Sequence, residues 1–297
     1  MLREEKAVSK LAISRELCNK CGLCVSACPF TASTRLADVD ILDVTPTNCI
    51  SCGHCAAICP SGALTHADFP LGALHSFNQE SLPSAEQIKQ LLITRRSIRA
   101  FEDTPVERGL IEQMIEGARY APTGHNVQST EFVVIEDKAT LHKITELTAE
   151  YLAKASKQLR NPLIRRIMSA AGARDLMSAA LPMISDMQTV AEDVRNGHDD
   201  VLYSAPYLLV FHANRSTMFA DVNAQLSIHN AALMCEGLGL GCFYAGYVIG
   251  SCGRDARIQK LLSIPDSHKI YAALAFGIPK YRFKQWMERN PPKITWI

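Results

Sequence analysis

The chain lacks long apolar runs, low-complexity tracts and a strong charge of either sign. None of its apolar segments approaches the roughly twenty residues of a membrane-spanning helix. The charged start MLREEKAVSK has no apolar core like that of a secretion signal. Lysine plus arginine number 31 against 30 aspartates and glutamates, and no basic stripe carries interleaved aromatic residues. We therefore expect a soluble cytoplasmic chain that binds neither membrane nor nucleic acid.

Cysteine, by contrast, is abundant, and eight of the eleven cysteines form two identical runs. Each run reads C-x₂-C-x₂-C-x₃-C and is followed by a proline, Pro29 or Pro60. The first run consists of Cys18, Cys21, Cys24 and Cys28, and the second of Cys49, Cys52, Cys55 and Cys59. This spacing is typical of iron–sulfur ligation, and iron–sulfur clusters carry single electrons. We therefore expect electrons to pass through the protein.

Disulfides and structural zinc are two other interpretations of these cysteines. Disulfides would need an oxidising compartment, and the sequence shows no signal peptide ahead of the first run. Structural zinc sites use paired C-x₂-C knuckles rather than three cysteines in register followed by Cys-Pro. The spacing therefore favours iron–sulfur clusters over both.

Residues 10–68 resemble a bacterial two-cluster ferredoxin, and both cysteine runs are complete. The resemblance implies two [4Fe-4S] clusters, with the fourth cysteine of each run binding the other cluster. One cluster would take Cys18, Cys21, Cys24 and Cys59, and the other Cys49, Cys52, Cys55 and Cys28. Such crossing would tie the two halves together, so a segment this small can fold with almost no apolar core.

The length of 297 residues predicts two domains. We expect a ferredoxin-like domain over residues 1–68, a linker over 69–84 and one larger domain over 85–297. The linker contains glycine, two prolines and several serines without a clear hydrophobic period.

Hydrophobic patterning in the larger domain predicts both helices and strands, which favours an α+β or α/β sheet domain. The predicted helices are 85–95, 105–119 and 221–237, and the predicted strands, all expected to be buried, are 131–136, 207–212 and 270–278. Ser84 is placed to cap the first helix, and Thr104-Pro105 to begin the second. Residues 138–200 look mostly helical, and we expect them to cover the active site.

A basic run, RRSIR, directly follows the first of these helices. Its polar members are Arg95, Arg96, Ser97 and Arg99. Three guanidinium groups this close together are costly without an anion, and arginine binds phosphate through two hydrogen bonds at once. A solvated basic turn is the alternative interpretation.

Two further stretches favour a bound ligand over a solvated turn. Residues 120–128, YAPTGHNVQ, form a turn-rich segment in which Asn126 and Gln128 present two amides. Residues 237–247, GLGLGCFYAGY, contain glycines that allow backbone to approach a flat ligand closely. In this order and spacing, the three stretches resemble the nitroreductase family of FMN enzymes over residues 85–297. The resemblance implies an α+β fold and an obligate homodimer with FMN at each subunit interface.

The resemblance also implies the residues that bind FMN. Its phosphate and ribityl chain, or the edge of its ring, would be bound by Arg95, Arg96, Ser97 and Arg99. The partner subunit would contribute Pro122, Thr123 and Gly124, while Asn126 and Gln128 would hydrogen-bond the flavin. Ala245 and Gly246 would bring backbone to the reactive edge of the ring. A basic residue near the C-terminus would return to the phosphate, with Arg289 the first candidate and Lys284 and Arg282 the next.

No residue need act as a nucleophile, because the cofactor performs the chemistry. Next to Asn126, His125 is a candidate proton donor on the substrate side, and Tyr244 and Tyr247 are weaker candidates. We expect His229 and Cys235 to be packing residues, and Cys242 to pack or to face the flavin; Cys252 has no assigned role.

The sequence thus predicts an iron–sulfur flavoprotein oxidoreductase. Electrons would come from a low-potential donor such as a separate ferredoxin, pass through the clusters to FMN, and reach a nitroaromatic, quinone or enone-like acceptor. In a first alternative, NAD(P)H reduces FMN directly and the clusters take electrons away. In a second alternative, the protein is a non-catalytic redox sensor or electron-transfer adaptor.

Overall fold

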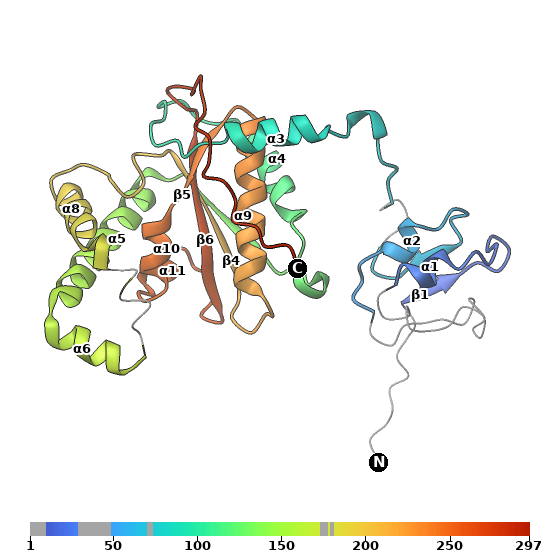
Figure 1. The fold of residues 1–297 in the computed structure, drawn as a ribbon, viewed down its shortest axis with the longest axis horizontal. Helices are drawn as coiled ribbons and strands as arrows, with labels where there is room; N and C mark the ends of the chain where they lie inside the picture. Colours follow the sequence, from blue (N-terminus) through green and yellow to red (C-terminus); the bar gives the residue numbers. More distant parts are fainter. Residues whose placement is uncertain (1–9, 29–48, 70–73, 173–177, 179–180) are drawn as a thin grey trace, which may run out of the picture. The chain divides into compact units, whose positions relative to one another are not determined.

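The structure, a computed structural model, describes residues 10–28, 49–69, 74–172, 178 and 181–297 (Figure 1). It divides into two compact units. The first contains the chain up to Leu82 together with His125–Val127, and the second contains Pro83–Gly124 and Gln128–Ile297. Residues 1–9 and 29–48 of the expected ferredoxin-like domain, Pro29 among them, lie outside the described residues.

The first unit repeats one backbone arrangement at its two cysteine runs. The short helices α1 (Leu23–Ser26) and α2 (His54–Ala57) each follow a glycine with a φ of 75°, Gly22 or Gly53. This left-handed conformation favours glycine, because a Cβ would clash there. The internal repeat in the sequence therefore gives two loops of the same shape.

A small antiparallel sheet joins the ends of this unit. Strand β1 (Leu11–Ile13) pairs with β2 (Leu64–His66), with Leu11 opposite His66. One turn of 3₁₀-helix, η3 (Gln79–Ser81), lies within the segment expected as a linker. Apart from Val25, Ala56, Ala63 and Leu64, the described residues of this unit bury few apolar side chains. So small an apolar core cannot stabilise this unit by itself, and the cysteine loops must therefore hold it together.

The second unit is built on a four-stranded sheet in the order β3-β4-β6-β5. Its strands are β3 (Glu131–Ile135), β4 (Tyr207–Asn214), β5 (Gly241–Tyr244) and β6 (His268–Gly277). All three pairings are antiparallel. Purely parallel α/β architecture is therefore excluded for this sheet, and the α+β expectation is confirmed.

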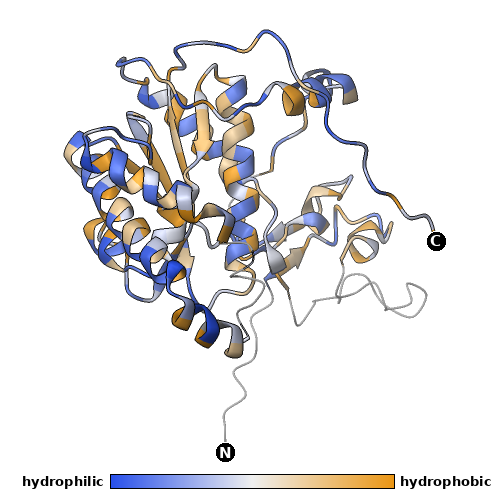
Figure 2. Ribbon diagram, turned by 60° about the vertical axis from the view of Figure 1, so that its left-hand side comes forward, coloured by the Kyte–Doolittle hydropathy of each residue, from blue (hydrophilic) through white to orange (hydrophobic). Residues whose placement is uncertain are grey.

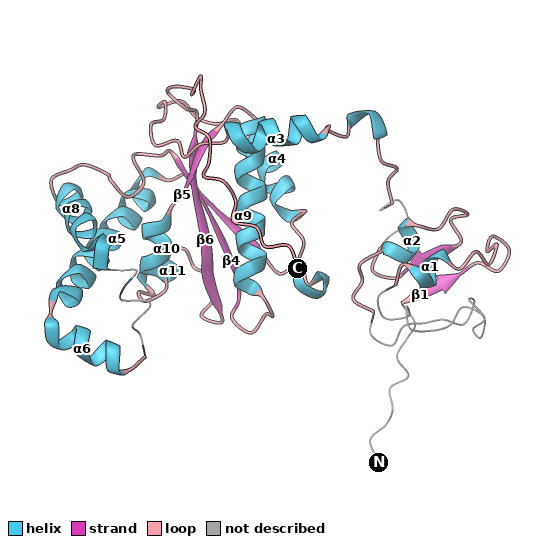
Figure 3. Ribbon diagram, viewed as in Figure 1, coloured by secondary structure: helices cyan, strands magenta, loops and turns pink. Residues whose placement is uncertain are grey.

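Helices cover both faces of the sheet (Figure 3). On one face lie α4 (Arg108–Arg119) and α9 (Ala220–Gly237), with α3 (Ala85–Thr94) against α9. On the other face α10 (Gly246–Cys252) packs on β6, and α5 (Lys138–Arg160) packs on α10. Beyond these, α6 (Pro162–Ala170), η5 (Leu181–Met183), α8 (Ile184–Arg195) and α11 (Arg257–Leu261) complete this layer.

The central strand β4 divides its side chains between two cores. Leu209 and Phe211 belong to the apolar cluster shared with α4 and α9, whereas Leu208 and Val210 belong to the cluster shared with α5 and α10. All four side chains are fully buried. This alternation follows from the two-residue period of a strand. Figure 2 shows apolar residues concentrated along the strands between the helical layers.

Most of the expected elements are present, with three differences. Helix α4 begins at Arg108 rather than at residue 105, because Glu107 before it has a non-helical backbone (φ −59°, ψ 131°); in this non-helical stretch the Val106 N–H donates to the buried Tyr207 hydroxyl at 3.2 Å. Strand β3 is an edge strand with exposed positions, not a fully buried one. Strand β5 was missed, because its glycine-rich surroundings were interpreted only as a ligand-binding stretch.

Ser84 caps helix α3 through a complete capping box. Its hydroxyl accepts from the Gln87 N–H at 3.3 Å, and the Gln87 side chain accepts from the Ser84 N–H at 2.7 Å. We expect Ser84→Ala to destabilise the helix by about 1 kcal/mol and Ser84→Asp to preserve it. Faster hydrogen exchange of the α3 amides in the alanine variant alone would support this. Equal exchange in both variants would contradict it.

Candidate functional site

All eight motif cysteines lie in the first unit, on two loops of the same shape. Burial raises the pKa of the Cys55 thiol, and the neighbouring Cys52, Cys49 and Cys28 raise it further. Burial likewise raises the pKa of Cys24, with Cys18 and Cys21 adding to the effect. Cys28, of the first run, is thus close enough to the second run to affect the pKa of Cys55. A [4Fe-4S] cluster takes four thiolate ligands, and the two runs contain eight cysteines.

His66 contacts one of these cysteines, and sequence reasoning missed it. Its imidazole is buried, and its Nε2 lies 3.4 Å from the Cys49 sulfur. Its Nδ1 accepts a hydrogen bond from the Asp68 N–H at 3.1 Å, so in the neutral ring Nε2 carries the proton. His66 therefore donates to the Cys49 sulfur. No spacing rule identifies this residue, because the contact depends on how β2 returns to the loop.

A polar cluster holds the second cysteine loop against the start of β1. The Lys10 ammonium donates to Asp68 Oδ2 at 2.8 Å and to Ser51 Oγ at 3.0 Å. The Ser51 hydroxyl also donates to the Asp68 carboxylate. Hydrogen bonds from Lys10 and then Ser51 lower the pKa of Asp68, so this exposed carboxylate stays ionised at neutral pH.

In the second unit, the RRSIR run lies along strand β5. The Ile98 N–H donates to the Cys242 carbonyl at 2.9 Å, and Ser97 forms a parallel bridge with Cys242. The guanidinium of Arg99 lies 5.6 Å from the ring centre of Tyr203 and 5.5 Å from that of Phe243. Two of the three predicted stretches, the arginine run and the glycine-rich run, are therefore neighbours in the fold.

A cavity of about 520 Å³ opens beside these residues. Its polar and aromatic lining includes Arg99, Tyr203, Phe243, Tyr244, Gly246 and Tyr247. Helices α5 and α8, from the segment expected as a cover, also line it, through Tyr151 and Met187 among others. This size and this mixture of apolar walls with a few polar groups suit a flat cofactor or a small organic ligand.

The backbone at residues 245 and 246 fits a flat group at the wall of this cavity. A Cβ built on Gly246 would meet no atom within 4 Å, so open space faces this glycine. The Ala245 N–H already donates to the Ala273 carbonyl at 2.9 Å. The Gly246 N–H opens helix α10 and has no intrahelical acceptor, which makes it the better candidate to hydrogen-bond a cofactor.

Tyr244 lines the same cavity and pairs with His229 of α9, which is not among the lining residues. The Tyr244 hydroxyl lies 3.1 Å from His229 Nδ1. Burial raises the pKa of Tyr244, and the charge of Arg95 opposes this rise. His229 is exposed on α9, so the expectation of a packing residue was wrong: its position faces outward from the helix.

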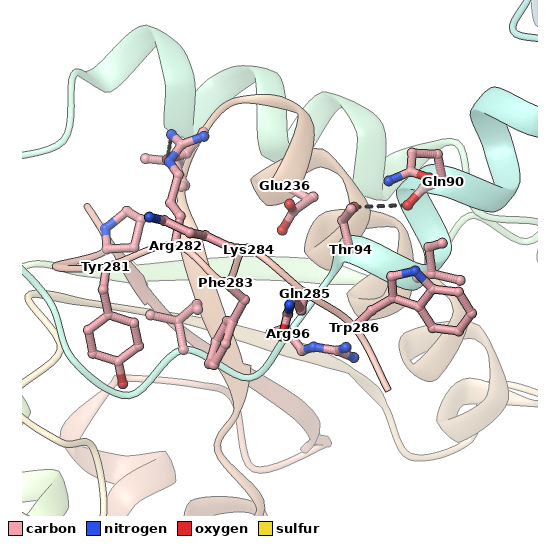
Figure 4. A pocket seen from close by; sticks show the side chains of 15 residues that line it. Gln90, Thr94, Arg96, Glu236, Tyr281, Arg282, Phe283, Lys284, Gln285 and Trp286 are labelled. Carbon is pink, nitrogen blue, oxygen red and sulfur yellow. Dashed lines mark hydrogen bonds between the residues drawn. The ribbon is translucent and has the colours of Figure 1, made fainter. Parts of the chain in front are cut away.

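A second pocket, of about 250 Å³, lies between α3, α9 and the C-terminal segment (Figure 4). Arg96, Arg282 and Lys284 line it, together with the Glu236 carboxylate. The Arg282 guanidinium also donates to the Gly239 carbonyl at 3.3 Å. Arg289, the first C-terminal candidate in the sequence, is exposed and is not among the lining residues. Three cations from two distant segments thus line one pocket, and such groups can bind an anion.

The segment around residues 123–128 has an unusual backbone. His125, Asn126 and Gln128 have φ values of 54°, 54° and 45°, which non-glycine residues seldom adopt. Such conformations cluster at functional sites. The Thr123 hydroxyl accepts from the Gln128 N–H at 3.1 Å. In the first unit, the Asn126 amide donates to the Ser51 carbonyl at 2.7 Å, while His125 is exposed.

A third pocket, of about 250 Å³, is lined by Thr123, Gln128 and Thr130 among others. The buried hydroxyl oxygens of Ser129 and Thr130 have no hydrogen-bond partner among the described residues. Buried polar atoms without partners are rare, and each indicates a missing ligand, water or neighbouring chain. The predicted Pro122, which is exposed, directly precedes this region.

The cysteines outside the two runs are packing residues. Cys235 and Cys242 are buried in the core between α9 and the sheet, so Cys242 does not face the cavity. Cys252 is half-buried, and burial raises its pKa to about 12. A thiol with so high a pKa is unreactive at neutral pH.

The fold and the two sets of residues define an iron–sulfur oxidoreductase. The chain belongs to the Nitroreductase family, whose model matches residues 77–278. Residues 10–60 match the model of the 4Fe-4S dicluster domain.

Relatives of known name match the larger unit. A "Putative NADH dehydrogenase/NAD(P)H nitroreductase" of Archaeoglobus fulgidus is 34% identical over 195 residues, which cover 66% of this chain and 87% of that protein. An FMN reductase (NAD(P)H) of Bacillus subtilis is 25% identical over 196 residues, covering 66% of this chain and 67% of that protein. A crystal structure of a nitroreductase with bound FMN from Bacteroides fragilis shares the fold, with a TM-score of 0.53, 18% identity, and coverage of 71% of this chain and 98% of that one.

Among the described residues, no helix combines the length and the apolar character needed to cross a membrane.

Proposed function

We propose that the protein transfers electrons from a low-potential donor through two [4Fe-4S] clusters to FMN, and from there to a small organic acceptor. The observation that carries this proposal is the cavity beside the RRSIR run, lined by Arg99, Tyr244 and Gly246, in a Nitroreductase-family chain that also carries a 4Fe-4S dicluster domain. When bound, FMN accepts electrons singly and delivers two, which matches one-electron clusters to a two-electron acceptor.

The residues at this cavity suit the ring of FMN. Arg99 would face the ring edge while it stacks over Tyr203 and Phe243, which fix its position. The Gly246 N–H would hydrogen-bond the reactive edge, where negative charge develops on reduction. Tyr244 lines this cavity and pairs with His229, so its hydroxyl can hold a proton for the acceptor. His125 stays a second candidate for that role.

The phosphate and ribityl chain need cations and hydroxyl donors. Arg95, Arg96 and Ser97 follow one another on the loop after α3, and Arg96 lines the pocket of Figure 4 together with Arg282 and Lys284. We propose that this pocket holds the phosphate, with Arg282 or Lys284 in the role first given to Arg289. Glu236 in the same pocket would offset part of the positive charge.

A homodimer would complete the site. In one chain, Thr123 and Gln128 line a different pocket from Arg99 and Gly246. The hydroxyl group of Thr130, which lines that pocket, and that of the adjacent Ser129 lack partners among the described residues. A second copy would bring Pro122, Thr123 and Gly124 to the flavin, with Asn126 and Gln128 as hydrogen-bonding amides.

In the first unit, the crossed cysteine sets would hold the clusters, and His66 would tune one of them. One set is Cys18, Cys21, Cys24 and Cys59, and the other is Cys49, Cys52, Cys55 and Cys28. A hydrogen bond to a ligating sulfur stabilises the reduced cluster and raises its potential. The cluster with Cys49 would therefore be the easier of the two to reduce. Such clusters are suited to the reducing cytoplasm.

Direct reduction by NAD(P)H is the second candidate function. It is favoured by the names of the relatives from Bacillus subtilis and Archaeoglobus fulgidus, which specify NADH or NAD(P)H. In that case the clusters would be the outlet for electrons rather than the inlet.

Anaerobic stopped-flow mixing separates the two directions. We expect reduced ferredoxin, or another low-potential one-electron donor, to reduce the clusters first and then bleach the flavin absorbance. We expect NADH or NADPH alone to bleach it at least about tenfold more slowly, a difference of about 1.4 kcal/mol in activation free energy. Rapid bleaching by NADH or NADPH alone would instead establish the second candidate.

A further inference from the structure

A cluster of two histidines and one glutamate lies at one end of the four-stranded sheet, where it has no place in the proposed electron path. Glu131 begins β3, His212 lies near the end of β4, and His268 begins β6. In the register of β3 and β4, Glu131 stands directly opposite His212. These two side chains therefore project from the same face of the sheet.

An irregularity in the sheet brings His268 to that face. Between β4 and β6, Phe211 pairs with Ala272 but His212 pairs with Ile270, so β6 carries one extra residue. As a result Ala272 and Leu274 belong to the core on the α9 side, whereas Ile270 belongs to the core on the α5 side. Without the extra residue, His268 would share a face with Ala272 and point away from His212. Bulges often redirect a side chain at a functional site.

The distances within the cluster suit a metal ion. The two Nδ1 atoms of His212 and His268 lie 3.0 Å apart, and His268 Nδ1 lies 3.9 Å from Glu131 Oε1. All three ligand atoms lie within 4.8 Å of one another. Two imidazole nitrogens bound to one zinc ion at about 2.0–2.1 Å are roughly 2.9–3.4 Å apart. The histidine pair already has that separation.

The backbone around the cluster is held in place. The Gln259 amide donates to the Pro265 carbonyl at 2.7 Å and to the His268 carbonyl at 3.0 Å. The His268 N–H donates to the Pro265 carbonyl at 2.9 Å. His212 is buried, while the Glu131 side chain is 60% exposed. The backbone of His268 is therefore held in place, and the Glu131 carboxylate can move to close the site from the solvent side.

We propose that Glu131, His212 and His268 form a binding site for a divalent transition metal ion, with Zn²⁺ as the best fit. Two imidazoles and one carboxylate are an established ligand set for zinc, which leaves a fourth position for water. The exposed side of Glu131 provides the opening for that water. The ion would join the ends of three strands and so stabilise the sheet independently of FMN or the clusters.

Zinc titration of the anaerobically purified holoprotein tests this site. After brief chelation and desalting, the full-length protein is equilibrated with ZnCl₂, desalted again and analysed for zinc, iron and sulfide per chain. We expect one zinc to be retained, an increase in the thermal midpoint of the larger unit, and no loss of iron or sulfide. Constant iron shows that the zinc has not displaced a cluster from the cysteines.

Three variants make the result specific. Glu131→Gln alters an exposed side chain and His268→Gln a half-buried one, and we expect each to weaken zinc affinity at least about tenfold. His142→Gln is the matched control, because His142 pairs with Glu146 at 3.3 Å on exposed α5. It should bind zinc like the wild type. Equal zinc retention in all four proteins, or none in the wild type, would overturn the proposal.

Discussion

Replacing Cys49 with serine is expected to remove iron from the protein and stop turnover driven by the low-potential donor. A serine hydroxyl is a poor substitute for a thiolate ligand, and each cluster depends on four sulfurs. The wild type should contain about eight irons per chain, and the variant about half as many or fewer. Because Cys49 lies in the first unit and the FMN cavity in the second, FMN content should not change. Iron, sulfide and flavin analysis under argon measures all three quantities.

Cys252→Ser is the matched control for that experiment. Cys252 lies outside both cysteine runs, and burial raises its pKa to about 12, so it should not hold iron. Its iron content and donor-driven turnover should equal those of the wild type. If Cys49→Ser retained full iron and sulfide while Cys252→Ser behaved normally, Cys49 would not be a cluster ligand.

The fold was largely predictable because its signals are local. The repeated cysteine spacing indicated two equivalent loops. The capping residue Ser84 predicted the start of helix α3, and the apolar run at residues 207–212 predicted strand β4. Errors arose where a distant contact decides the outcome. The non-helical backbone at Glu107 delays helix α4, next to the hydrogen bond from Val106 to the distant Tyr207, and no local pattern near residue 105 reports that contact. Strand β5 is recognisable only from its pairing with β6.

The candidate site was predictable only in its motif residues. Arg99 and Gly246 were identified from their stretches, and they line one cavity. Contacts between residues far apart in sequence were not predictable. The hydrogen bond from His66 to Cys49 depends on a strand return, and His268 reaches His212 only because of a bulge. None of these three histidines belongs to a recognisable motif when the sequence is considered alone.

Arg96→Ala tests the phosphate end of the FMN site. Hydrogen bonds to charged groups contribute about 1.5–3 kcal/mol each. Losing the Arg96 contact should therefore raise the FMN dissociation constant about tenfold to a hundredfold. Arg96→Lys keeps the charge but loses the paired hydrogen bonds of a guanidinium, so its dissociation constant should lie between those of the wild type and the alanine variant. Fluorescence titration of flavin-depleted protein, still holding its clusters, measures these constants.

Arg108→Ala is the matched control, because its side chain is 91% exposed and pairs only with Glu112 among the described ion pairs. Its removal also lowers the net charge by one, so it accounts for any general electrostatic effect on an anionic ligand. FMN affinity in this variant should equal that of the wild type. An Arg96→Ala protein with unchanged FMN affinity would place the phosphate away from the pocket of Figure 4. Arg95 and Ser97 would then be its next candidate ligands, because the same loop carries them past strand β5.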